Sequence, residues 1–230
     1  MKKLIITSLI ILLSLSSYKM FEFRERLHEI IDNTKWENTL RSHGFYDSGS
    51  IVFFGDSHFA LWKMARSFGC MPIINRGISG DQAAKAVNRF DRDVIGLKPK
   101  IAVILLGTND IGHGVPIDSI VADIDYMIGG CKNNGIIPVV CGLPPTREDY
   151  SDKHPKEKIV VLNSILKALA RQRGINYIDI YSTLADKTGF IKGEYATKDS
   201  HLSPEGYLEI TKIMLPILMR GLTKIERKDL

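Results

Sequence analysis

The chain has 230 residues, of which 44% are hydrophobic and 25% are charged, as in an ordinary globular protein. Its 19 glycines and 9 prolines are close to average usage and exclude collagen-like and low-complexity disordered chains. The net charge of +5 is not gathered in a dense lysine and arginine cluster with interleaved aromatic residues, so a nucleic-acid-binding surface is not expected. Three cysteines without CxxC or His/Cys ligand spacing predict neither a disulfide framework nor a metal site.

Residues 1–17 have the pattern of a secretory signal peptide. Lys2 and Lys3 precede an uncharged apolar run from Leu4 to Leu15, and the small residues Ser16 and Ser17 follow. The run is shorter than the ~20 apolar residues that span a bilayer. No cysteine lies near its end to carry a lipid. We therefore expect a secreted or periplasmic protein without a stable membrane anchor; the alternative is a buried N-terminal helix.

Beyond a stretch with helical spacing at residues 21–36, short apolar runs alternate with longer amphipathic segments. The apolar runs predict five strands, at Ile51–Phe54, Pro72–Asn75, Ile101–Leu106, Ile136–Cys141 and Ile175–Ile180. The longer segments predict helices, at His58–Ser67, Asp81–Leu97, Val115–Lys132, Lys156–Arg173 and Pro204–Leu222. This alternation is typical of right-handed βαβ units. The expected fold is α/β: a single three-layer α/β/α domain over residues 18–230, with a five-stranded parallel sheet and a core at about 50–220.

Polar residues follow the predicted strands at the positions where such sheets bind ligands, beyond the carboxyl ends. The first strand is followed by Gly55–Ser57, the second by Gly77–Asp81 and the third by Gly107–Asp110, and Asp199–Leu202 precedes the last helix. Together they supply a hydroxyl, glycine N–H groups, a side-chain amide and an imidazole. A nucleophile, a base and hydrogen-bond donors are the groups that acyl transfer requires.

These four blocks, in order and spacing over roughly Ile51–Tyr207, resemble the SGNH superfamily of GDSL-type esterases and acylhydrolases. The resemblance implies a flavodoxin-like fold and a carboxylic ester hydrolase that forms an acyl-serine intermediate and needs no metal or organic cofactor. It implies that Ser57 is the nucleophile and His201 the base. It further implies an oxyanion hole made by the backbone N–H of Ser57, the backbone N–H of Gly80 and the side-chain amide of Asn109.

One position departs from the family pattern. The family places its triad aspartate three residues before the histidine, where this chain has Lys198. Asp199 stands two residues before His201, and in extended backbone such a pair points the same way. We therefore expect Asp199 to be the third catalytic residue. The alternatives are a Ser–His dyad oriented by a backbone carbonyl, or a catalytically weak binding module on the same fold.

The polar loop Gly142–Glu157 is longer than most connections between a strand and a helix, which indicates a binding loop or structural filler. Within it, Arg147 and Tyr150 are candidate substrate contacts, and His58 is expected to border the pocket. The polar loop favours short acyl groups, such as acetyl, on carbohydrates or similar small-molecule or glycan esters; a lysophospholipase or thioesterase is the alternative. Three further aspartates are expected to tie loop amides or cap helices: Asp56, Asp110 and Asp179.

Overall fold

The computed structural model describes residues 50–69, 71–199 and 201–223. The predicted signal peptide, the helical stretch at residues 21–36 and the start of the predicted domain lie outside these ranges. The described strands form one sheet in the order β2-β1-β3-β4-β5, and every neighbouring pair is parallel. The strands are β1 (Ile51–Gly55), β2 (Ile73–Gly77), β3 (Ile101–Leu105), β4 (Ile137–Cys141) and β5 (Asn176–Ile178). The five-stranded parallel sheet and the α/β fold class predicted from the sequence are confirmed.

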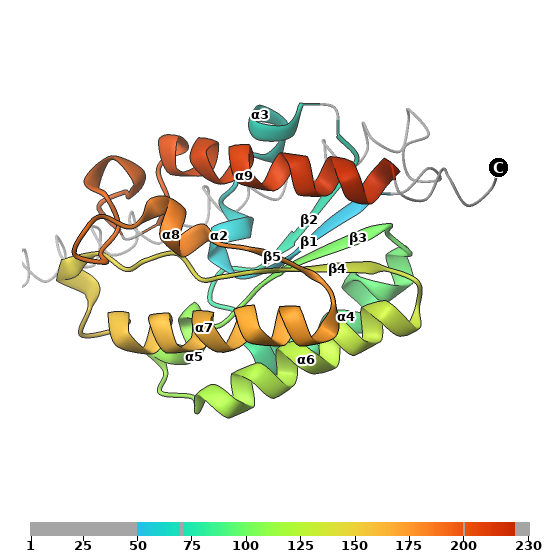
Figure 1. The fold of residues 1–230 in the computed structure, drawn as a ribbon, viewed down its shortest axis with the longest axis horizontal. Helices are drawn as coiled ribbons and strands as arrows, with labels where there is room; N and C mark the ends of the chain where they lie inside the picture. The colour runs from blue at the N-terminus through green and yellow to red at the C-terminus, as the bar shows by residue number, and fades with distance from the viewer. Residues whose placement is uncertain (1–49, 70, 200, 224–230) are drawn as a thin grey trace, which may run out of the picture. The chain divides into compact units, whose positions relative to one another are not determined.

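Helices cover both faces of this sheet (Figure 1). On one face lie α4 (Ala83–Asp93), α6 (Ile117–Asn133) and α7 (Lys156–Arg173). On the other lie α2 (Ser57–Ala60), α3 (Met64–Phe68), α8 (Ile180–Leu184) and α9 (Pro204–Thr223). The remaining short elements are α5 (Thr108–Gly112) and the 3-10 turns η1 (Ile95–Leu97), η2 (Glu148–Tyr150) and η3 (Gly193–Tyr195). None of the helices in the described ranges combines the length and the apolar composition needed to cross a bilayer.

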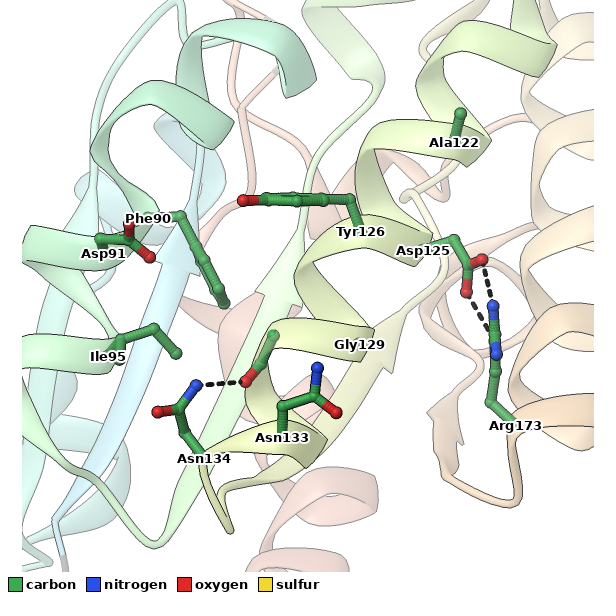
Figure 2. Close-up of a pocket in the computed structure, with 11 residues that line it drawn as sticks. Phe90, Asp91, Ile95, Ala122, Asp125, Tyr126, Gly129, Asn133, Asn134 and Arg173 are labelled. Atoms are coloured by element: carbon green, nitrogen blue, oxygen red, sulfur yellow. Dashed lines mark hydrogen bonds and ion pairs between the residues drawn. The ribbon is translucent and has the colours of Figure 1, made fainter.

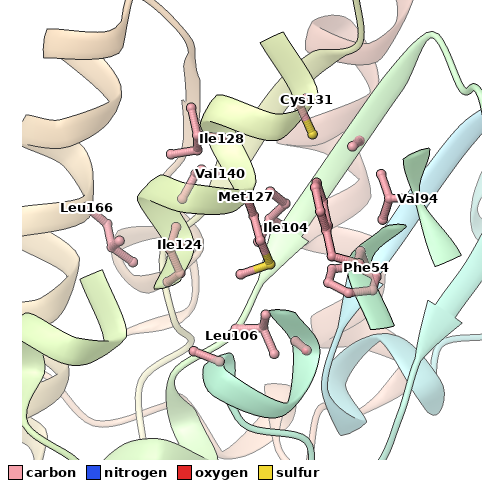
Figure 3. Close-up of a cluster of buried hydrophobic side chains, with 14 of the residues drawn as sticks. Phe54, Val94, Ile104, Leu106, Ile124, Met127, Ile128, Cys131, Val140 and Leu166 are labelled. Carbon is pink, nitrogen blue, oxygen red and sulfur yellow. The ribbon is translucent and has the colours of Figure 1, made fainter. Parts of the chain in front are cut away.

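The strands are buried on both faces because alternate side chains enter two separate cores. In β1, Val52 and Phe54 join the core beneath α4, α6 and α7, part of which Figure 3 shows. Ile51 and Phe53 enter the core beneath α9. Each such side chain contributes about 1.5–3 kcal/mol when fully buried. This two-sided burial is why the sequences of β1, β3 and β4 are continuously apolar rather than alternating.

The predicted helix over residues 58–67 is wrong, because the chain forms two short helices there. α2 ends at Ala60 and α3 begins at Met64, and the intervening Trp62 is only 2% exposed. Its ring packs 4.8 Å from the Tyr207 ring, measured between centroids, and its indole N–H donates to the Ser67 hydroxyl at 2.7 Å. Burying this large ring has taken precedence over continuing the helix.

The other predicted elements are present with shifted ends. The strand predicted to run to Ile180 stops at Ile178, because Asp179 accepts a hydrogen bond from the Ser182 N–H at 3.0 Å and begins α8. This confirms the predicted capping role of Asp179. α5 was not predicted, because five residues after a glycine give too short a pattern to identify a helix.

Gly55 and Gly77 let the backbone segments around α2 approach closely. A Cβ on Gly55 would lie 2.3 Å from the carbonyl oxygen of Leu105 in β3. A Cβ on Gly77 would lie 2.3 Å from the backbone nitrogen of Ala60 in α2. Both contacts are to backbone atoms, which cannot rotate away as a side chain can. The sheet edge that carries Ser57 is therefore fixed by backbone packing.

We expect Gly55→Ala to lower the free energy of unfolding by about 2–3 kcal/mol, because the added methyl group overpacks the backbone of β3. Urea denaturation measures this change. Gly129→Ala is the matched control, since no heavy atom lies within 4 Å of its Cβ position in α6. The control should raise stability by about 0.5–1 kcal/mol through helix propensity. An unchanged unfolding midpoint in Gly55→Ala would contradict the close approach.

Candidate active site

Ser57 and His201, which are 144 residues apart in the sequence, meet at the carboxyl edge of the sheet. The His201 Nε2 atom lies 3.2 Å from the Ser57 Oγ atom, within hydrogen-bond distance. Ser57 is the first residue of α2 and stands two residues after the end of β1. The preceding Asp56 accepts a hydrogen bond from the His58 N–H at 3.0 Å and so caps this turn, as expected of a structural aspartate. The sequence-predicted nucleophile and base are thus placed in contact.

Tyr207 in α9 ties the histidine side of the site to the serine side. Its hydroxyl donates to the backbone carbonyl of His58 at 2.8 Å. Because His58 follows Ser57 and Tyr207 lies one turn into the helix after His201, this bond fixes α2 against α9. The sequence analysis did not single out Tyr207; a tyrosine in the first turn of a helix carries no signal for a partner 149 residues away.

Asp199 lies beside the other ring nitrogen of His201. Its Oδ2 atom is 3.2 Å from Nδ1, within ion-pair distance, although the contact lacks hydrogen-bond geometry. Nδ1 has no hydrogen-bond partner among the described residues. The Asp199 side chain is 72% exposed, and its Oδ1 atom accepts a hydrogen bond from the Thr197 hydroxyl. The structure brings Asp199 to the imidazole, and its catalytic role stays a prediction.

The loop that carries Gly80 is held against the start of α5. The side-chain amide of Asn109 donates to the Asp81 carbonyl at 2.9 Å. Both carboxylate oxygens of Asp110 accept from the Ala83 N–H, at 3.1 and 3.2 Å, which confirms its predicted structural role. Gly80 has φ +79°, a left-handed conformation that favours glycine. The two loops predicted to supply oxyanion donors are therefore joined at Asp81.

Arg89 of α4 connects the loop that carries Ser57 to the loop that carries Gly80. It is 9% exposed, and its guanidinium donates to the Asp81 carboxylate at 2.6 and 2.9 Å and to the Gly55 carbonyl at 3.1 Å. It also donates to Asp93 and to the Arg76 carbonyl, each at 3.0 Å. The sequence analysis missed Arg89. The available signal was an arginine placed among the apolar positions of an amphipathic helix.

Two ionisable groups next to Ser57 are buried. Burial raises the pKa of the Asp56 carboxyl to about 7, and the charges of Asp110 and Asp81 add to the increase. Burial lowers the pKa of the His58 imidazole to about 3, with smaller contributions from the charges of His201 and His154. Both groups are therefore neutral between about pH 3 and pH 7. His58 lies beside the imidazole of His201, with ring centroids 6.2 Å apart, and its role in substrate contact stays a prediction.

The structure places Arg147 against the loop that precedes His201. Its guanidinium pairs with the Asp149 carboxylate at 2.7 and 2.8 Å and donates to the Thr197 carbonyl at 3.1 Å. Tyr150 ends the 3-10 turn η2 in the same loop, and is partly buried. Contacts of Arg147 and Tyr150 with substrate stay predictions.

Comparison with known proteins identifies the family. Residues 45–208 match the GDSL-like lipase/acylhydrolase family. The chain belongs to this family. The sequence resemblance to the GDSL-type acylhydrolases is thereby confirmed, and the matched range contains Ser57, Gly80, Asn109 and His201.

Relatives of this acylhydrolase come from mammals and bacteria. It is 26% identical over 181 residues to the bovine platelet-activating factor acetylhydrolase IB subunit alpha1, covering 76% of this chain and 77% of the relative. Among solved structures it resembles a candidate acylhydrolase from Bacteroides fragilis, with a TM-score of 0.70, 27% identity, and coverage of 75% and 88% of the two chains. A GDSL-like lipase from Bacteroides thetaiotaomicron shares the fold, with a TM-score of 0.68, 24% identity, and coverage of 83% and 99%.

A hollow of about 590 Å³ lies between α4 and α6, away from the Ser57 edge of the acylhydrolase (Figure 2). It is lined by residues near the C-terminal ends of these helices, such as Phe90, Tyr126 and Asn133, and by Arg173 at the end of α7. Because helices in βαβ units run antiparallel to the strands, their C-terminal ends lie at the opposite edge of the sheet from the serine. This hollow therefore does not belong to the candidate active site.

We expect Asp56→Asn to change how stability depends on pH. Because folding raises the pKa of Asp56 from 3.8 to about 7, the neutral carboxyl stabilises the fold below about pH 4, and this contribution is lost as pH rises through 7. Asparagine stays neutral, so the variant should gain up to about 4 kcal/mol relative to wild type between pH 4 and pH 8. Urea unfolding of both proteins across this range measures the difference. His58 titrates in both proteins, so its contribution cancels from the difference in unfolding free energy between them. A difference that does not change with pH would contradict the raised pKa of Asp56.

Proposed function

We propose that this acylhydrolase is a serine esterase that hydrolyses carboxylic esters of short acyl groups through an acyl intermediate on Ser57. The observation that carries the proposal is the 3.2 Å contact between the His201 Nε2 atom and the Ser57 Oγ atom. A serine hydroxyl is a weak nucleophile until an adjacent base takes its proton, and this contact supplies the base. The family match supports the same reaction class.

In the proposed reaction, the Ser57 Oγ atom attacks the ester carbonyl carbon while His201 Nε2 takes the hydroxyl proton. The tetrahedral intermediate collapses, the imidazolium gives its proton to the leaving alcohol, and an acyl-Ser57 ester remains. Water then attacks this ester while His201 takes its proton, the imidazolium returns a proton to the Ser57 Oγ atom, and the acid is released. The negative charge of Asp199, 3.2 Å from Nδ1, stabilises the imidazolium in both steps.

Asn109 is arranged to donate to the developing oxyanion. A side-chain amide has two N–H donors. One donates to the Asp81 carbonyl at 2.9 Å, which fixes the plane of the amide. The second is left to join the backbone N–H groups of Ser57 and Gly80 in the oxyanion hole. A donor held in advance stabilises the transition state without reorganising, and such donors contribute about 10²–10³ in turnover.

A short acyl group on a polar alcohol, such as an acetylated carbohydrate, is the proposed substrate class. The name of the mammalian relative, an acetylhydrolase, supports a short acyl group. A hollow of about 490 Å³ beside the His201 loop supports a polar alcohol, because four charged side chains line it together with the apolar Phe190 and Ile191; the charged ones are Arg147, Glu148, Asp149 and Asp186. Secretion or export to the periplasm is part of the proposal and rests on residues 1–17 of the sequence.

A lysophospholipase or thioesterase activity is the second candidate. Ile78, in the loop that carries Gly80, is 46% exposed and offers an apolar surface beside the site. The mammalian relative is named for platelet-activating factor, which also favours this candidate.

We expect a fluorophosphonate probe to label the wild type and the control Ser119→Ala, but not Ser57→Ala. The probe forms a bond only with an activated serine, and Ser119 is an exposed residue of α6. Ester hydrolysis should fall by more than about 10³-fold in Ser57→Ala and in His201→Ala. Gel fluorescence and initial rates measure both effects. A folded wild type that takes up no probe would favour a binding module.

We expect kcat/KM to be highest for acetyl esters and to fall as the acyl chain lengthens. Nitrophenyl esters of two to twelve carbons test acyl length, because they share one leaving group. Acetylated sugars, a lysophospholipid and an acyl thioester then test the alcohol or thiol part. Faster turnover of the lysophospholipid or the thioester than of the acetylated sugars would select the second candidate.

A further inference from the structure

Thr197 closes the loop that carries Asp199 and His201. Ala196 and Leu202 form an antiparallel bridge at the base of this loop. Inside it, the Thr197 N–H donates to the His201 carbonyl at 2.7 Å. The Thr197 hydroxyl lies 3.0 Å from the same carbonyl and contacts the Asp199 carboxylate. Since the carbonyl already accepts from the N–H and the carboxylate is charged, the hydroxyl proton goes to Asp199, where the hydrogen bond is stronger.

The orientation of the Asp199 carboxylate depends on its hydrogen bond with the Thr197 hydroxyl. Its side chain is 72% exposed, so packing does not restrict its rotamer. The hydroxyl of Thr197 holds Oδ1, which leaves Oδ2 beside the His201 ring. The same hydrogen bond is the largest cause of the lowered pKa of Asp199 and keeps the carboxylate charged. A solvated carboxylate without such a partner would spend much of its time turned toward water.

The backbone of Thr197 is held from the opposite side. Arg147 donates to its carbonyl at 3.1 Å, and the pairing of Arg147 with Asp149 fixes the guanidinium plane. The loop after β4 thereby supports the loop before α9. All three hydrogen-bonding groups of Thr197 thus have partners: its N–H donates to His201, its carbonyl accepts from Arg147 and its hydroxyl donates to Asp199.

We propose that Thr197 is a positioning residue that aims the Asp199 carboxylate at the Nδ1 atom of His201. This allows an aspartate two residues before the histidine to take the place of the family's aspartate three residues before it. The inference rests on the proposed function, because it assigns Asp199 to the same reaction. The Thr197 hydroxyl acts through Asp199 and does not touch the reacting atoms.

The test compares Thr197→Val, which keeps the shape but removes the hydroxyl, with Thr197→Ser, which keeps the hydroxyl. We expect Thr197→Val to lower kcat for an acetyl ester by about 10-fold with little change in KM, because the imidazolium loses its partner in the transition state. Thr197→Ser should stay within about 2-fold of wild type. Thr183→Val is the matched control, because its hydroxyl bonds the Asp179 carbonyl away from the site; it should leave kcat unchanged.

A double-mutant cycle separates positioning from a general structural role. Adding Thr197→Val to Asp199→Ala should change kcat by less than about 2-fold, because the hydroxyl acts through Asp199. Additive losses, or wild-type kcat in Thr197→Val, would overturn the inference.

Crystal structures of the wild type and Thr197→Val give a readout that does not depend on activity. The Asp199 Oδ2 atom should lie within 3.5 Å of Nδ1 in the wild type and should leave that distance in the variant. A carboxylate that stays in place without the hydroxyl overturns the inference. If the folded wild type takes up no fluorophosphonate, the proposed function fails, while this comparison still decides whether Thr197 directs Asp199.

Discussion

The hydrogen bonds of the buried Arg89 guanidinium are the interactions on which the candidate active site depends. Removing a charge from water costs several kcal/mol, and the cost is offset only when every donor finds a well-placed partner. Arg89 meets the carboxylates of Asp81 and Asp93, the Gly55 carbonyl and the face of the Phe54 ring, 4.1 Å from its centroid. Since Gly55 ends β1 and Asp81 follows Gly80, neither loop can move without leaving part of this charge unpaired. One side chain therefore sets the spacing between the serine loop and the Gly80 loop.

The two halves of the site are held by different kinds of contact. The serine half is part of the sheet, where backbone packing at Gly55 and the neutral, buried Asp56 and His58 leave little freedom. The histidine half stands on a loop outside the sheet. The hydrogen bond from the Tyr207 hydroxyl in α9 to the His58 carbonyl in α2 joins the helix after this loop to the serine half. The proposed nucleophile is therefore held by the sheet, while its proposed base, 3.2 Å away, is held by a separate loop.

The sequence predicted the fold well, because the three central strands, β1, β3 and β4, are continuous apolar runs and each long helix has a clear apolar stripe. Ser57, Gly80, Asn109 and His201 were found because they stand at strand ends or before a helix in a known order. The helix over residues 58–67 was misjudged, because the burial of Trp62 is a tertiary effect that local periodicity does not contain. The roles of Arg89 and Thr197 were missed for a related reason. Their partners are backbone carbonyls and carboxylates brought close by folding, and no spacing rule encodes them.

The exposure of Asp199 has a consequence for the electrostatic environment of the His201 imidazole, the proposed base. In a triad whose carboxylate is buried, the surrounding protein shields the charge pair from dissolved salt. Here the carboxylate stands mostly in solvent, 3.2 Å from its ring, where counterions gather within a Debye length of about 8 Å at physiological ionic strength. Dissolved ions therefore screen the attraction between the Asp199 carboxylate and a protonated His201 ring, and this attraction weakens as the salt concentration rises.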